Sequence, residues 1–146
     1  MKNSQRGSTF QSGMNKHALP ILETRENKYS NRRFECEHVF AELTALCPIT
    51  LLPDFYTLRL VYEPARKLVE LKSMKLYLVA FRGLEILHEE LANRILDDFI
   101  GKVKPRWVRI QLTVNNRGGI LTTIRRDWDR RLGDRISERL AKGRDT

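Results

Sequence analysis

The feature that most constrains the fold is a period-two alternation of apolar and polar residues. It is clear over residues 55–63, where Tyr56, Leu58, Leu60 and Tyr62 share one face, and recurs in residues 33–43 and 106–114. Because successive side chains of a β-strand point to opposite faces, this alternation predicts strands with one buried and one polar face. The sequence NNRGG at 115–119 is a strong turn signal, so residues 120–124 are expected to form the returning strand.

Between these two pairs of strands the apolar period changes to that of helices. Ser73 is expected to cap a first helix over residues 74–82, and Gly83 to end it. A second helix is expected over residues 85–101, closed by Gly101. Its apolar stripe has steps of four: Leu87, Leu91, Ile95 and Phe99. The resulting order ββααββ predicts an α+β fold, a four-stranded antiparallel sheet with two helices on one face.

The chain divides into a central segment and two basic flanks. Residues 1–30 are polar and predict a flexible basic arm, residues 31–124 a single domain, and residues 125–146 a basic C-terminal segment with an amphipathic helix at 129–142. Of the net charge of +9, the segment 34–120 carries only +1, from twelve basic and eleven acidic side chains. Basic arms can bind polyanions, but they can equally serve only solubility.

Neither a membrane span nor a secretory signal is evident. The sequence has no run of about 18 apolar residues, and its N-terminus lacks an apolar centre. The two cysteines, Cys36 and Cys47, are too few for a disulfide framework and lack the spacing of a zinc site. A cytoplasmic protein with free thiols is expected.

The loop between the first two predicted strands contains Cys47 and, seven residues later, Asp54. Pro48 and Pro53 would stiffen this loop. An ordinary thiol is only a few per cent thiolate near neutral pH, so a nucleophilic Cys47 needs help from its surroundings. A catalytic pair, with Asp54 moving protons to a substrate nitrogen, is one interpretation. A packed thiol and a turn aspartate is the other.

Three further groups of polar residues could bind a ligand or be ordinary surface. Glu70, Lys72 and Lys75 surround a strand-to-helix junction, where unpaired N–H groups attract anions. Arg117 precedes two glycines in a hairpin turn and could pair with a phosphate. His88 and Glu89 lie on the second helix, where Glu89 is furthest from the apolar stripe. Each group also fits a solvated surface.

Taken together, these segments resemble the NADPH-dependent 7-cyano-7-deazaguanine reductases, the nitrile reductases of queuosine biosynthesis, in their short single-module form. All eight positions from Glu70 to Tyr77 match the signature of that family. "ELTALCP" at 42–48 is similar to the segment with its nucleophilic cysteine, and Asp54 falls at its spacing for the acid/base aspartate. "HE" at 88–89 and "RGGI" at 117–120 follow in family order, so the resemblance covers about residues 38–124.

The resemblance implies a reaction and a set of site residues. Cys47 would attack the nitrile carbon to form a covalent thioimide, with Asp54 as the proton donor, and no metal would take part. Two hydride transfers from NADPH would complete the reduction. The residues implied for the substrate are Val69, Glu70, Leu71, His88 and Glu89, and those for the NADPH phosphates are Lys72, Lys75 and Arg117.

The same resemblance implies the tunnelling fold and assembly into rings, commonly two stacked pentamers with sites between subunits. Direct binding of nucleic acid is not expected for such a reductase. The sequence departs from the family at three places: Leu51-Leu52 replaces a common Gly-Gln, Leu87 an aromatic residue, and Asn116 a proline.

Two alternative functions remain open. A related amidinotransferase uses a similar Cys and Asp on the cyano base in tRNA, although those relatives lack the lysine-containing signature. A non-catalytic nucleic-acid-binding module would use the basic flanks, but the nearly neutral central segment argues against it.

Overall fold

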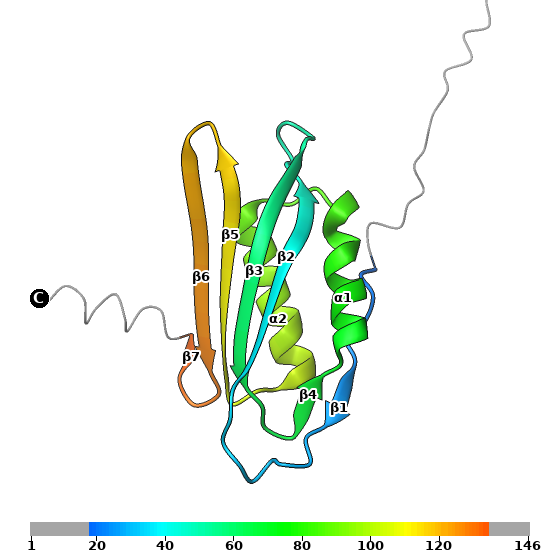
Figure 1. Ribbon diagram of the computed structural model, residues 1–146, viewed down its shortest axis with the longest axis vertical. Coiled ribbons are helices and arrows are strands. Elements are labelled where there is room, and N and C mark those ends of the chain that lie inside the picture. Colours follow the sequence, from blue (N-terminus) through cyan, green and yellow to red (C-terminus); the bar gives the residue numbers. More distant parts are fainter. Residues whose placement is uncertain (1–17, 135–146) are drawn as a thin grey trace, which may run out of the picture.

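The computed structural model describes residues 18–134, which form an α+β fold with antiparallel sheets (Figure 1). The elements in chain order are β1 (Thr24–Glu26), β2 (Cys36–Leu46), β3 (Pro53–Glu63), β4 (Lys67–Val69), α1 (Leu71–Val79), a 3₁₀ turn (Ala80–Gly83), α2 (His88–Val103), β5 (Trp107–Arg117), β6 (Ile120–Asp129) and β7 (Gly133–Asp134). The long strands and helices follow the predicted order ββααββ. The short strands β1, β4 and β7 were not predicted.

The main sheet has the strand order β2-β3-β5-β6-β7, and β1 pairs with β4 in a separate ribbon. The predicted alternation is confirmed in β3 and β5, whose inward side chains are buried under both helices. These inward residues are Tyr56, Leu58, Leu60, Tyr62, Val108, Ile110, Leu112 and Val114. The opposite face of the sheet is open, with Val39 and Phe55 more than half exposed. On its outer edge, β2 has no strand neighbour within residues 18–134.

Both helices begin and end at residues other than those predicted. The side chain of Glu70, not Ser73, caps α1 by accepting hydrogen bonds from the backbone N–H groups of Lys72 and Ser73 at 2.9 and 2.7 Å. A carboxylate offers two acceptor oxygens, so it satisfies two helix-terminal donors at once. Helix α2 continues past Gly101 to Val103 and ends at Lys104, which is left-handed with φ 51°.

The predicted boundaries of the domain are too narrow at both ends. Leu22 is buried in the core and β1 pairs with β4, so the ordered fold begins within the predicted arm of residues 1–30. At the other end, pairing of β5 with β6 continues to Trp107 and Asp129. The predicted helix at 129–142 is therefore wrong over residues 129–134, which contain a strand end, a turn and β7. Its remaining residues lie outside the described part of the chain.

Strand β6 extends past its predicted end at residue 124 because of contacts between strands, which a local sequence pattern does not reveal. Asp127 accepts a hydrogen bond from Arg109 at 2.9 Å across the two strands, and Trp128 packs on the core. These contacts extend β6 beyond residue 124. Within residues 18–134, the helices are too short or too polar to cross a membrane.

Glu63, at the end of β3, is a buried carboxylate at the end of the sheet away from Cys47. It accepts hydrogen bonds from Arg33 Nε at 2.6 Å, Trp107 Nε1 at 2.8 Å and Arg106 Nη1 at 3.2 Å. The hydrogen bond from Arg33 is the largest cause that lowers the pKa of Glu63 from 4.5 to about 2. This network joins residues 30–33 to the main sheet.

We expect acid to weaken the fold through Glu63. Because its folded pKa is depressed, its contribution is complete above about pH 4.5 and is lost as the pH falls toward about 2. The stability advantage of the wild type over Glu63→Gln should shrink by roughly 1 kcal/mol between about pH 6 and about pH 3, about half of what the pKa change alone would give, because Arg33 is exposed to solvent screening. Urea unfolding of both proteins measures this difference. A constant difference across that range would contradict the prediction.

Candidate active site

The loop between β2 and β3 holds Cys47 by its backbone. The Cys47 N–H donates to Leu52 O at 2.9 Å, and the Leu51 N–H donates to Cys47 O at 2.8 Å. Leu46 pairs with Pro53 directly below this turn. The thiol therefore sits at a closed turn at the end of a hairpin, in a fixed relation to Asp54.

Leu51 stands where the family commonly has glycine, and its backbone has a conformation that favours glycine. Its φ is 58°, in the left-handed region, where a side chain costs about 1–2 kcal/mol and glycine fits freely. The turn thus has the backbone shape that suits the common Gly-Gln, although this chain has Leu51-Leu52. Ile49, Leu51 and Leu52 are 84%, 58% and 55% exposed, so the loop presents apolar side chains to its surroundings.

We expect Leu51→Gly to raise the free energy of unfolding by about 0.5 kcal/mol, because relief of left-handed strain exceeds the added entropy of the unfolded chain. Leu52→Gly is the matched control. It removes an equally exposed leucine whose φ is not positive, so it should lower stability by about 0.5–1 kcal/mol. Chemical unfolding of both variants measures the sign of each change in the free energy of unfolding. Equal losses of stability in the two variants would show that Leu51 is unstrained.

The surroundings of Cys47 favour its thiolate. The thiol is free and half-buried. Hydrogen bonding from the Thr50 side chain, then from the backbone of Thr50 and Ile49, lowers the pKa of Cys47 below 9.0, while burial and the charge of Asp54 oppose this change. A lowered pKa increases the fraction of the reactive form. Thr50 was not among the predicted site residues, and its signal would have been a hydroxyl three residues after the cysteine in a tight turn.

Asp54 is buried, with its side chain only 2% exposed. Arg117, from the hairpin between β5 and β6, donates to Asp54 Oδ1, while Asp54 Oδ2 lies 3.9 Å from His88 Nδ1. The carboxylate raises the pKa of Arg117 through this hydrogen bond and its charge. Two elements distant in sequence thus converge on Asp54.

His88 is the first residue of α2 and lies beside β3. The Tyr56 hydroxyl is 2.8 Å from His88 Nδ1, and the two rings meet edge to face at 5.5 Å. Glu89 is exposed at the start of α2. The structure therefore brings together Asp54, His88 and Arg117, and Cys47 and Glu89 lie close enough that their charges, after burial and the charge of Asp54, raise the pKa of the adjacent Tyr56. The β2-β3 and β5-β6 hairpin loops lie at this same end of the sheet (Figure 1).

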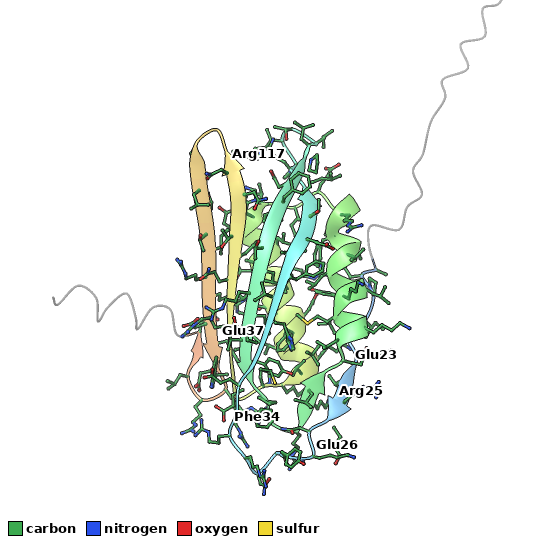
Figure 2. The ribbon with its side chains drawn as sticks, in the orientation of Figure 1. Glu23, Arg25, Glu26, Phe34, Glu37 and Arg117 are labelled. Atoms are coloured by element: carbon green, nitrogen blue, oxygen red, sulfur yellow. The ribbon has the colours of Figure 1, made fainter. Side chains whose placement is uncertain are left out.

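The other predicted site residues, 69–72 and 75, are not part of this cluster in the single chain. They surround the start of α1, next to the β1-β4 ribbon and toward the end of the molecule away from the Cys47 loop (Figure 1). Figure 2 shows Arg117 at one end, and Arg25 and Glu26 of β1 at the other. Val69 is buried, whereas Leu71, Lys72 and Lys75 are exposed.

Glu70 is already engaged at this junction, because its carboxylate caps α1. Its hydrogen bonds from the backbone of Ser73 and Lys72 lower its pKa. The N–H groups of Lys72 and Ser73 are therefore not available to an anion. What this junction offers is the two lysine ammonium groups, neither of which forms an ion pair within residues 18–134.

A solved structure defines the class of fold to which this chain belongs. The structure described as the archaeosine synthase QueF-Like in the apo form matches 65% of this chain and 91% of its own, with a TM-score of 0.57 and 23% identity. At that identity the match establishes a shared fold. The chain is therefore an α+β protein of the architecture found in that synthase.

Sequence relatives identify the family. The family model described as QueF, QueF-like protein, matches residues 53–132. Proteins named NADPH-dependent 7-cyano-7-deazaguanine reductase from Chloroherpeton thalassium and Chlorobium chlorochromatii are 45% and 44% identical over 109 and 106 residues, which cover 75% and 73% of this chain and 94% and 91% of theirs. The chain belongs to the QueF family.

Proposed function

We propose that this protein reduces the nitrile of 7-cyano-7-deazaguanine to 7-aminomethyl-7-deazaguanine with NADPH, the activity in the names of its relatives. The observation that carries the proposal is a thiol of lowered pKa in a closed turn that ends at a buried carboxyl. A nitrile carbon is an electrophile that suits such a thiolate, and the nitrile nitrogen needs a proton as the bond forms. The octet from Glu70 to Tyr77 adds the signature associated with reduction.

Cys47 and Asp54 have complementary roles in this reaction. The Cys47 sulfur bonds to the nitrile carbon, one C–N π bond breaks, and Asp54 gives a proton to the nitrogen, which yields a thioimide. Bound NADPH would supply the two hydrides that this carbon needs, one before and one after the sulfur leaves. Asp54, reprotonated from solvent, gives a second proton to nitrogen as the amine forms, so two protons are consumed per nitrile. Glu89 would accept two N–H groups from the edge of the base, with His88 beside it.

The residues proposed for the cofactor are chemically suited to phosphate. Lys72 and Lys75 are exposed on the first turns of α1 and carry no ion pair within the described residues. Arg117 differs, because it is bonded to Asp54. Its proposed contact with an NADPH phosphate requires one of its remaining donors or release of Asp54.

We further propose the tunnelling fold and a ring assembly in which each site lies between two chains. The distance between the Cys47 cluster and the start of α1 supports this, since a neighbouring chain could bring the two together (Figure 1). The edge of β2, which has no strand neighbour among residues 18–134, and the exposed leucines Leu51, Leu71 and Leu76 support it as well. Stacked pentamers and a cytoplasmic location, where Cys36 and Cys47 remain free thiols, complete the proposal.

The domain plan that goes with this function is a basic N-terminal arm, a catalytic domain and a basic C-terminal segment. We place the catalytic domain at residues 18–134, the part of the chain that the structure describes. The excess positive charge lies outside its centre, so direct binding of RNA is not part of the proposed reaction.

The test is nitrile-dependent oxidation of NADPH. Purified protein should oxidise NADPH only when 7-cyano-7-deazaguanine is present, with about two equivalents consumed per nitrile, as two hydride transfers require. NADPH oxidation that is absent at every substrate concentration would overturn the proposal. Consumption of ammonia or glutamine on tRNA carrying the cyano base, without NADPH oxidation, would instead support the alternative of a related amidinotransferase.

A further inference from the structure

Tyr56 is a buried tyrosine whose hydroxyl lies at the centre of the proposed site, although nothing in its sequence pattern distinguishes it from a core residue. It is two residues after Asp54 on β3, so both side chains point to the same face of the sheet. The residue is only 1% exposed. A buried hydroxyl requires a hydrogen-bond partner, and here that partner is His88 Nδ1 at 2.8 Å.

The neighbouring carboxylate cannot replace this partner. Asp54 Oδ2 lies 3.9 Å from His88 Nδ1, beyond hydrogen-bonding distance. Tyr56 is therefore the group that holds the imidazole by its Nδ1 atom, and the edge-to-face contact of the two rings at 5.5 Å restricts the rotation of the imidazole.

The direction of this hydrogen bond follows from the partners of Tyr56, because within residues 18–134 the hydroxyl makes no other hydrogen bond and its proton can be donated only to His88 Nδ1. Burial, then the charge of Asp54, raises the pKa of the hydroxyl, with smaller effects from Cys47, Glu89 and Arg117. The hydroxyl thus keeps its proton and can donate it to Nδ1. A neutral imidazole that accepts at Nδ1 carries its own proton on Nε2.

We propose that Tyr56 is a positioning residue, which holds His88 in one rotamer and as the Nε2–H tautomer, so that this N–H recognises an acceptor on the bound deazaguanine. The inference rests on the proposed function, because His88 is taken to line the base pocket. It assigns Tyr56 to substrate recognition and not to the transfer of protons or hydride. Loss of the hydroxyl should therefore weaken substrate binding more than it slows turnover.

The test compares Tyr56→Phe with Tyr77→Phe. Both substitutions remove one hydroxyl from a buried ring that makes an edge-to-face contact, but Tyr77 donates to Asp98 at 2.7 Å, outside the cluster. We expect Tyr56→Phe to raise the KM for 7-cyano-7-deazaguanine about five- to tenfold with kcat within about twofold. Tyr77→Phe should leave the KM for 7-cyano-7-deazaguanine unchanged. An equal effect of the two variants would overturn the inference.

Two further measurements show whether Tyr56 acts through His88. In His88→Gln, adding Tyr56→Phe should raise KM no further, because the group that Tyr56 positions is gone. Imidazole ¹⁵N spectra provide a readout independent of activity, with only three histidines to assign. The wild type should show an unprotonated Nδ1 on His88, and Tyr56→Phe a mixture of tautomers.

The outcomes separate this inference from the proposed function. Additive KM effects, or identical His88 spectra in the wild type and Tyr56→Phe, would overturn the role of Tyr56 even in an active reductase. A wild type that never oxidises NADPH would overturn the reductase proposal, whereas the tautomer spectra would still report whether Tyr56 fixes His88.

Discussion

Cys47→Ala should abolish the covalent adduct with 7-cyano-7-deazaguanine and lower kcat for NADPH oxidation by at least about a thousandfold, because the proposed thioimide forms on the Cys47 sulfur. Intact-mass measurement with substrate and without NADPH detects the adduct on the wild type. The measured mass increase should equal that of the whole nitrile, since addition of a thiol to a nitrile expels no leaving group.

Cys36→Ala is the matched control for this experiment. Cys36 is the other free cysteine, is also half-buried, and lies at the opposite end of β2 from the Cys47 loop. Its variant should retain both adduct and turnover. An adduct that persists in Cys47→Ala and disappears in Cys36→Ala would assign the nucleophile to Cys36 and overturn the proposed site.

Asp54→Asn should separate proton transfer from nucleophilic attack. Asparagine has nearly the same shape and can still meet Arg117, but it has no proton of suitable acidity for the nitrogen. We expect kcat to fall by about 10²- to 10⁴-fold, while Cys47 still forms the adduct at a reduced rate. Stopped-flow NADPH oxidation and time-resolved intact mass measure the two steps separately.

Asp98→Asn provides the comparison for Asp54→Asn. Asp98, like Asp54, accepts a hydrogen bond from an arginine, here Arg94 at 2.9 Å. It accepts another from Tyr77 at 2.7 Å, and it lies on α2 away from Cys47. Its loss should change stability without changing kcat. If Asp54→Asn retained kcat within about threefold, Asp54 would be a structural partner of Arg117 and not the proton donor.

Much of the fold followed from local pattern. The alternation through Tyr56, Leu58 and Leu60 predicted β3, and it is confirmed, because the side-chain direction in a strand depends only on the strand itself. The order ββααββ was predictable for the same reason. The caps at Glu70 and Lys104 were not, since several neighbouring residues could have ended each helix.

The wrong predictions for the segments before residue 31 and after residue 124 have a different cause. Strand β1 has only three residues and β4 another three, which is too short for a reliable period, and their pairing depends on contacts across more than 40 residues of sequence. Likewise, the pattern after residue 124 is amphipathic in both helical and strand terms. The ion pair of Asp127 with Arg109 and the packing of Trp128 extend the strand.

What the sequence by itself determined is the set of secondary-structure elements and the chemistry available in the Cys47 loop, because residues close in sequence share one turn. Only the tertiary structure decided which groups surround Asp54. Arg117 lies 63 residues from it along the chain, and Tyr56 lies 32 residues from His88. Strand register and the placement of α2 bring these groups together, and a local pattern specifies neither.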